Sequence, residues 1–246
     1  MKLVLFFLFI LPVALLPANA LGQEPVRILV ITGGHDYDEV TFTGMLEGLG
    51  DGFSFEIEEF PDAFNLFLPE NRDKYDVIVF YHMWQTISTE QKKAFSECIM
   101  DGKPLVVLHH SICAFDGWNE YIRIIGGKYF HVPTVVDDRE YPASTYEHDR
   151  HITLSVVDTL HPVTKGLRDF ELLDETYKGF YLSPDVTPLL TTRDPSSTPV
   201  VGWAHRYGKA RVVTIQSGHD APTFKDQNYR KLLRQALLWV FEGVEP

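Results

Sequence analysis

Short apolar runs alternate with amphipathic stretches through the first half of the chain. Continuous apolar runs are typical of strands buried on both faces of a parallel sheet, and apolar residues at helical spacing are typical of the helices that cover it. The pattern predicts strands at 26–31, 53–60, 75–81 and 103–110 and helices at 38–49 and 88–100. This order predicts an α/β fold with a doubly wound, mostly parallel sheet and helices on both faces.

The pattern changes after residue 130. Between residues 131 and 205 short apolar segments lie among Pro- and Asp-containing turns and are predicted to be strands at 151–157, 170–173, 187–192 and 199–205. They predict a β-rich insertion or sheet extension that shapes one side of a cleft. A strand at 210–216 and an amphipathic helix at 229–241 then return to the first pattern. No Gly/Ser-rich linker or internal repeat divides the chain, so residues 21–246 are expected to form a single domain.

The N-terminus has the features of a secretory signal. Lys2 precedes an apolar run at 3–16, and Ala18-Asn19-Ala20 is a small-x-small cleavage pattern, so residues 1–20 are predicted to be a signal peptide. The run is shorter than the roughly 20 residues that span a bilayer as a helix. We therefore expect export to the periplasm or the extracellular space, without a stable membrane anchor after signal cleavage.

Charge and cysteine content narrow the function classes. The formal net charge of −12 disfavours nucleic acid and anionic membranes as partners. The two cysteines, Cys98 and Cys113, are too few for a disulfide scaffold, and the sequence leaves open whether they pair.

Histidines gather where the predicted strands end. Ligands of doubly wound sheets bind at the carboxyl ends of the strands, and five of the ten histidines fall there: His35, His82, His109, His110 and His219. A single histidine in such a place is more often a hydrogen-bonded, partly buried side chain. Four loops that each bring one or two favour a shared site, and neutral imidazole binds divalent metals such as zinc. His35, His109 and His219 are the candidate ligands, although no HExxH-like spacing is present.

The segment "VVLHHSICAF" carries the strongest local signal. A strand that turns abruptly into a helix can expose one side chain as a nucleophile elbow, and here the elbow falls at His110 or Ser111. Ser111 is either a nucleophile activated by a histidine such as His219 or the N-cap of the next helix. Cys113 is interpreted as a core or disulfide residue.

Carboxylates and aromatic residues near the same loops complete the candidates. Glu175 and Asp220 are predicted to act with His109, His110 and His219 in acid–base catalysis or to orient them. Helix capping or solvated loop positions are the ordinary alternatives for such carboxylates, and they are favoured for Asp38 and Asp116. The predicted substrate-binding residues, some of them aromatic rings that could stack on sugars, are Gly34, His35, Asp36, Ser111, Trp84 and Tyr177.

Several longer stretches resemble the trehalose-utilisation (ThuA-like) family, within the class I glutamine amidotransferase-like fold. They are "ILVITGGHDYD", "VVLHHSICAFDGWNEYIRIIGGKYF", "HPVTKGLRDFELLDETY", "WAHRYGKARVV" and "SGHDAPTF". The resemblance implies a flavodoxin-like sheet and a role with trehalose-type disaccharides or their 3-keto derivatives. Relatives in the amidotransferase fold carry a cysteine at the elbow, served by a late histidine. This chain has no cysteine in register there, so glutamine hydrolysis is not expected.

Three functional hypotheses follow. The first is an exported enzyme, a lyase or hydrolase, that acts on a disaccharide or keto-sugar through a histidine-lined cleft, with a divalent metal as a possible aid. The second is a non-catalytic sugar-binding protein on a degenerate amidotransferase scaffold. The third is a metal-dependent hydrolase of an ester or amide. The expected partner in the first two is a small saccharide, and the sequence does not determine the oligomeric state.

Overall fold

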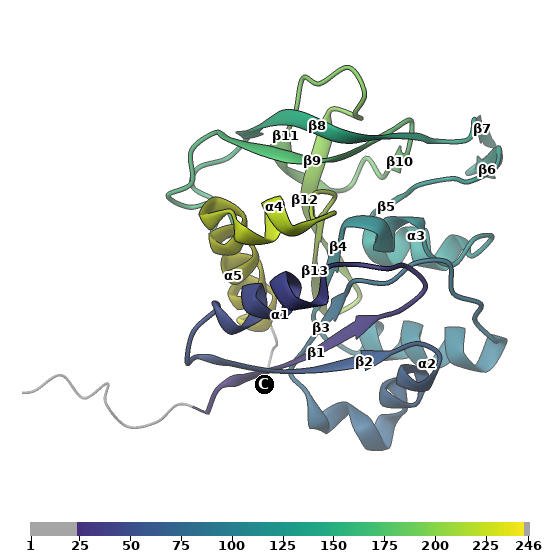
Figure 1. Cartoon of the computed structure of the whole chain (residues 1–246). Coiled ribbons are helices and arrows are strands. Elements are labelled where there is room, and N and C mark those ends of the chain that lie inside the picture. The colour runs from purple at the N-terminus through teal and green to yellow at the C-terminus, as the bar shows by residue number, and fades with distance from the viewer. Residues whose placement is uncertain (1–23, 244–246) are drawn as a thin grey trace, which may run out of the picture.

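The computed structural model describes residues 24–243, which form one continuous mixed sheet with helices on both faces (Figure 1). The predicted signal peptide at 1–20 lies outside the described residues. Within them, no helix is both long and apolar enough to cross a membrane.

The first half of the sheet is parallel. Its strands lie in the order β2 (Phe53–Glu59), β1 (Val26–Thr32), β3 (Val77–Phe80), β4 (Leu105–Leu108) and β13 (Ala210–Ile215). All four pairs of neighbours are parallel. With β13 as the fifth strand this is the 2-1-3-4-5 order of flavodoxin-like folds, so the predicted fold class is confirmed.

The second half of the sheet is antiparallel and continues from the edge of β13. It adds β12 (Val200–Tyr207), β11 (Thr187–Thr191), β8 (Thr145–Val156) and β9 (Phe170–Lys178). The segment expected to be an insertion or sheet extension is therefore an extension. The strand predicted at 170–173 continues to Lys178, because residues 174–177 stay buried and Asp174, Thr176 and Tyr177 pair with β8.

Small ribbons lie beside this extension. β5 (Gly127–Lys128) pairs with β10 (Tyr181–Leu182), and β6 (Thr134–Val136) pairs with β7 (Arg139–Tyr141). Between α3 (Asn119–Ile125) and β8 the chain passes through β5, β6 and β7, and Tyr129 and His131 of this passage reach the site described below.

Two helical layers enclose the sheet (Figure 1). One apolar core forms beneath α1 (Glu39–Glu47), α4 (Ala221–Lys225) and α5 (Gln227–Phe241). The other forms beneath α2 (Thr89–Met100), α3 (Asn119–Ile125) and the 3₁₀ turn η1 (Asp62–Phe67), which η2 (Pro69–Lys74) follows. Cys98 and Cys113 are buried free thiols, both within this second core.

Candidate functional site

The chain turns sharply at the end of β4. His109 follows Leu108 with a φ of 48°, in the left-handed region that non-glycine residues rarely adopt. It opens the five-residue 3₁₀ turn η3 (His109–Cys113) in place of the α-helix expected directly after the strand. The elbow residue is thus His109, one position before His110 and two before Ser111, the two residues predicted for it. Backbone strain of this kind gathers at functional sites.

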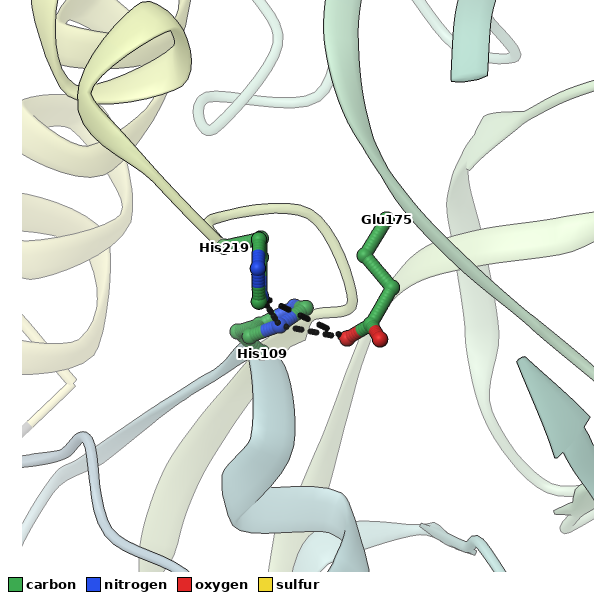
Figure 2. A group of neighbouring side chains, drawn as sticks. All are labelled: His109, Glu175 and His219. Atoms are coloured by element: carbon green, nitrogen blue, oxygen red, sulfur yellow. Dashed lines mark hydrogen bonds and ion pairs between the residues drawn. The ribbon is translucent and has the colours of Figure 1, made fainter. Parts of the chain in front are cut away.

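His109 is the centre of a buried polar cluster (Figure 2). Its side chain is 0% exposed, and its Nδ1 lies 2.8 Å from the backbone oxygen of Gln216. Because a carbonyl oxygen only accepts, Nδ1 must carry the proton of this hydrogen bond. Nε2 therefore faces the cluster, at 3.1 Å from each of three atoms: Glu175 Oε2, His219 Nδ1 and the Tyr177 hydroxyl.

Glu175 reaches the cluster from the antiparallel half. It lies on β9, with its side chain 6% exposed, and its Oε2 is also 3.5 Å from His219 Nδ1. Its other oxygen, Oε1, is 3.3 Å from Nδ1 of His148, whose side chain is half exposed. The register of β8 and β9 shifts between Glu147 and Arg150, so His148 lies in a bulge opposite Glu175. Bulges of this kind re-aim side chains beside active sites.

Asp174 ties the late loop to β9. Its Oδ1 accepts hydrogen bonds from the backbone N–H groups of Glu175 and His219, at 2.8 and 3.0 Å. Its Oδ2 accepts from the Gly218 N–H and the Thr223 hydroxyl, at 2.8 and 3.0 Å. The buried carboxylate of Asp174 thus fixes the distance between Glu175 and His219, the two residues that contact His109 Nε2.

Burial and neighbouring charges set the protonation of the cluster. Burial alone would raise the pKa of Glu175, but its hydrogen bond to His109 and the charge of that ring outweigh burial and lower it. Burial, followed by repulsion from His109, lowers the pKa of His219. The favoured state therefore has an ionised Glu175 beside a neutral His219.

A cavity of about 350 Å³ opens beside this cluster. Glu175 and His148 contribute its polar side, together with His35 and His131. Its remaining walls are largely aromatic: Trp84, Tyr129, Tyr146 and Tyr177. A concave, mostly apolar pocket with a few convergent polar groups is the usual form of a small-molecule site. A larger hollow of about 640 Å³ shares no lining residue with it and holds no such cluster, so volume alone does not locate the chemistry.

One aromatic wall is braced by an ion pair between a buried lysine and a half-exposed aspartate. Trp84 stacks on His131 at 4.1 Å between ring centroids. The Nδ1 of His131 lies 2.8 Å from Asp116, and Asp116 also pairs at 3.1 Å with Lys128, whose side chain is 2% exposed. Asp116 thus positions the ring stack at the cavity mouth.

Three of the predicted site residues do not join the cluster. Asp220 is exposed and caps α4, accepting from the Ala221 N–H. Asp36 is exposed, and its backbone oxygen contacts His35. Ser111 is fully buried, and its hydroxyl accepts from the backbone N–H of His82. Ser111 therefore joins the loops after β3 and β4, and its hydroxyl is not presented to the cavity.

The other predicted residues surround the cluster at different depths. His110 is buried behind it, stacked on His35 at 4.8 Å, and burial lowers the pKa of His110 well below its usual value. His35 lines the cavity, 6.2 Å from His219 between ring centroids. Gly34 has a φ of +80°, and a Cβ there would lie 2.0 Å from the Met83 oxygen, so glycine lets two loops approach closely. Tyr177 and Trp84 line the cavity as described.

Of the three candidate metal ligands, the structure brings His109 and His219 together. The third residue beside them is Glu175 and not His35. Sequence reasoning also missed His148, Asp174, Tyr129 and Tyr146. All four lie in or beside the antiparallel extension, where strand ends do not mark a ligand-binding edge. The one usable signal was "EHDRH", in which Asp149 adopts a φ of +55° at the bulge.

Family and structural comparisons agree on what the chain resembles. A family model for ThuA, described as trehalose utilisation, matches residues 27–240. The chain belongs to the ThuA family. This membership supports a role in carbohydrate metabolism. A search of curated protein sequences finds no match.

Solved structures extend this result to the fold of the ThuA chain. A putative ThuA-like protein from Parabacteroides merdae has a TM-score of 0.72 and 20% identity, covering 89% of this chain and 91% of that one. One from Bacteroides uniformis has a TM-score of 0.70 and 22% identity, covering 92% and 95%. A putative GMP synthase protein from Thermoplasma acidophilum has a TM-score of 0.53 and 14% identity, covering 88% and 94%. At these identities the likeness shows the fold alone.

Proposed function

We propose that this ThuA-family chain is an enzyme that removes a proton from the carbon beside the carbonyl of a 3-keto disaccharide. The observation that carries the proposal is the buried Glu175, held by His109 and His219 on one oxygen and facing His148 with the other at the side of a cavity. Export of the mature chain, as the N-terminal sequence suggests, would place this activity outside the cytoplasm.

The walls of the cavity favour a saccharide. Four aromatic rings line it, and the C–H faces of sugar rings pack on aromatic faces. The polar groups lie at one side, so one end of the ligand would meet Glu175 while the remainder contacts Tyr129, Tyr146 and Trp84. This arrangement orients a disaccharide with one reacting ring.

The chemistry follows from the two oxygens of Glu175. A ketone at C3 acidifies the C2–H bond, and Glu175 Oε1 with His148 accepts that proton. The electron pair forms the C1–C2 double bond, the C1–O bond to the second sugar breaks, and the leaving oxygen takes up the proton from Glu175. His109 and His219, on the other side of the carboxylate, fix its orientation.

The test is turnover of 3-ketotrehalose, with trehalose as the unoxidised control. We expect mass spectrometry to detect released glucose and an unsaturated keto-sugar from the keto substrate only. The matched variants are His148→Ala, in the cavity, and His151→Ala, an exposed histidine on the same strand. Loss with the first and retention with the second supports the proposal. Calorimetry that detects saccharide binding without any turnover would contradict it and support the non-catalytic sugar-binding alternative.

A further inference from the structure

We propose that His109 Nε2, His219 Nδ1 and Glu175 Oε2 bind one divalent transition-metal ion, for which zinc is the best match. The inference deepens the proposed function, because it places an ion at the same cluster. It assigns these atoms to the ion and leaves Glu175 Oε1 and His148 to the substrate.

The three atoms have the spacing of metal ligands. They form a triangle with sides of 3.1, 3.1 and 3.5 Å. Ligands at about 2.0–2.1 Å from a tetrahedral zinc ion lie roughly 3.3 Å from one another. An ion could therefore be bound to all three atoms with movements of only a few tenths of an ångström. Among residues 24–243 this is the group of histidine, cysteine and acidic side chains that converges in this way.

The cluster needs a positive charge at its centre. His109 Nδ1 donates to Gln216, so a ring that has given up its Nε2 proton presents a lone pair there, towards Glu175 and His219. That lone pair faces the lone pairs of the Glu175 carboxylate at 3.1 Å, which is repulsive unless a proton or a metal ion lies between them. A proton satisfies one pair of atoms, whereas an ion satisfies all three at once. The side chains of His109 and Glu175 are 0% and 6% exposed, so solvent does not screen this repulsion.

The ligands are held as metal ligands usually are. A metal-bound histidine typically donates its other N–H to a carbonyl or carboxylate, and His109 donates to Gln216. The Gln216 side chain in turn donates to the backbone oxygen of Glu175 at 2.9 Å. Asp174 accepts from the backbone N–H groups of both Glu175 and His219. The triangle is thus positioned by hydrogen bonds that do not depend on an ion.

The donor set selects the kind of ion. Two imidazole nitrogens and one carboxylate oxygen suit zinc and its first-row neighbours, whereas Ca²⁺ and Mg²⁺ prefer sites built of oxygen. Three protein ligands leave a fourth position free for water or a substrate oxygen, which is the arrangement of catalytic zinc sites. At this cluster the ion would polarise the carbonyl oxygen of a bound keto-sugar.

Metal content and metal titration test the site. The full mature protein, prepared without a histidine tag or chelator, is analysed by elemental mass spectrometry, stripped, and titrated with Zn²⁺ by calorimetry and with Co²⁺ by visible absorption. We expect about one ion per chain. We expect Glu175→Gln and His219→Ala to weaken binding by about 100-fold or more, and Asp174→Asn by about 10-fold. His151→Ala, an exposed histidine of β8, is the matched control and should bind as wild type.

The outcomes separate this inference from the proposed function. Failure of folded wild-type protein to bind Zn²⁺ or Co²⁺, or binding that Glu175→Gln and His219→Ala leave unchanged, overturns the metal site. Circular dichroism establishes that each variant is folded, and Glu175→Gln keeps the side-chain volume. Metal binding without turnover of any keto-sugar would refute the proposed function alone. Full turnover by metal-free protein would refute a role of the ion in turnover and leave the proposed function standing.

Discussion

The two halves of the sheet contribute to the site in different ways. The parallel half ends its strands at one edge, and its loops deliver His109 after β4 and His219 after β13. The antiparallel half delivers Glu175 from the middle of β9 and His148 from a bulge in β8. The cluster lies where the two halves meet. Strand ends supply the nitrogen atoms of His109 and His219, while strand interiors supply the carboxylate, His148 and much of the cavity wall.

This difference explains which site residues can be found from the rule that ligands bind at the carboxyl ends of parallel strands. In a parallel sheet all strands point the same way, so their carboxyl ends converge whatever the side chains are. In an antiparallel sheet the ends alternate, and a residue reaches a site only through register and bulges.

The largest effect is expected at the junction. Replacing Glu175 by Gln keeps the shape but removes the charge that His109 and His148 face. We expect turnover of a keto-disaccharide to fall by about 10²–10⁴-fold, the range for loss of a general base. Steady-state kinetics measures this effect. Activity within a few-fold of wild type would show that the antiparallel half only encloses the site.

A second prediction concerns a histidine that the parallel half buries for packing. His82 lies among Phe60, Phe80 and Phe115, and burial lowers its pKa to about 3. In the unfolded chain His82 has a pKa near 6.5 and is protonated below that pH, whereas in the folded protein it stays neutral down to about pH 3. The contribution of His82 to the free energy of unfolding is therefore fully present above pH 6.5 and is lost as the pH drops towards 3. Between pH 7 and pH 5 the free energy of unfolding decreases by about 2 kcal/mol for this reason.

His82→Phe should remove that dependence. Urea unfolding at pH 7 and pH 5 is expected to show a stability loss about 2 kcal/mol smaller than in wild type. His82→Leu serves as a second variant in case the larger ring strains the core. Equal pH slopes in wild type and both variants would mean that His82 is protonated in the folded protein.

A smaller effect is expected at the wall of the antiparallel half. Tyr146 lines the cavity, is 56% exposed and contacts His148 edge-on at 5.2 Å between ring centroids. Tyr146→Ala should raise the KM for a disaccharide by about 2–10-fold, the value of one aromatic contact, and leave kcat within about two-fold. A matching fall in kcat would place Tyr146 in the chemical step instead.

The smallest effect is expected at Asp220. Its exposed carboxylate caps α4 and makes no contact with the cluster. Asparagine caps helices about as well, so Asp220→Asn should change stability by less than about 1 kcal/mol. Turnover should remain at the wild-type level. Asp174→Asn is the contrasting variant, because the buried Asp174 carboxylate accepts four hydrogen bonds. Equal behaviour of the two would contradict the roles assigned here.

The sequence predicted the parallel half of the fold well. Apolar runs such as 26–31 and 75–81 contain the strands β1 (Val26–Thr32) and β3 (Val77–Phe80), because a short continuous apolar segment fits a strand that is buried on both faces. The strand predicted at 170–173 ended too early, because residues 174–177, "DETY", are mostly polar and a sequence pattern does not identify such residues as buried strand. Their burial depends on partners from elements far along the chain, as with Asp174 and the N–H of His219. The pattern of polar and apolar residues within a segment does not reveal hydrogen-bond partners that lie far away in the sequence.

The site was predictable to the same extent. His109 and His219 could be found because each follows a strand of the parallel half. His148 could not, since a bulge is a property of the pairing of β8 with β9. The difference between Asp220, a helix cap, and Asp174, an anchor for His219, also depends on three-dimensional position, because both are aspartates next to other candidate residues.

Hydrogen–deuterium exchange on the substrate tests the central claim most directly. A 3-keto disaccharide is incubated with the protein in D₂O, and deuterium at C2 is followed by NMR. We predict exchange or elimination at C2 with wild type and His151→Ala, and loss of both with Glu175→Gln. An inert C2–H bond in the presence of wild-type protein, with the saccharide bound and unchanged, would contradict the account.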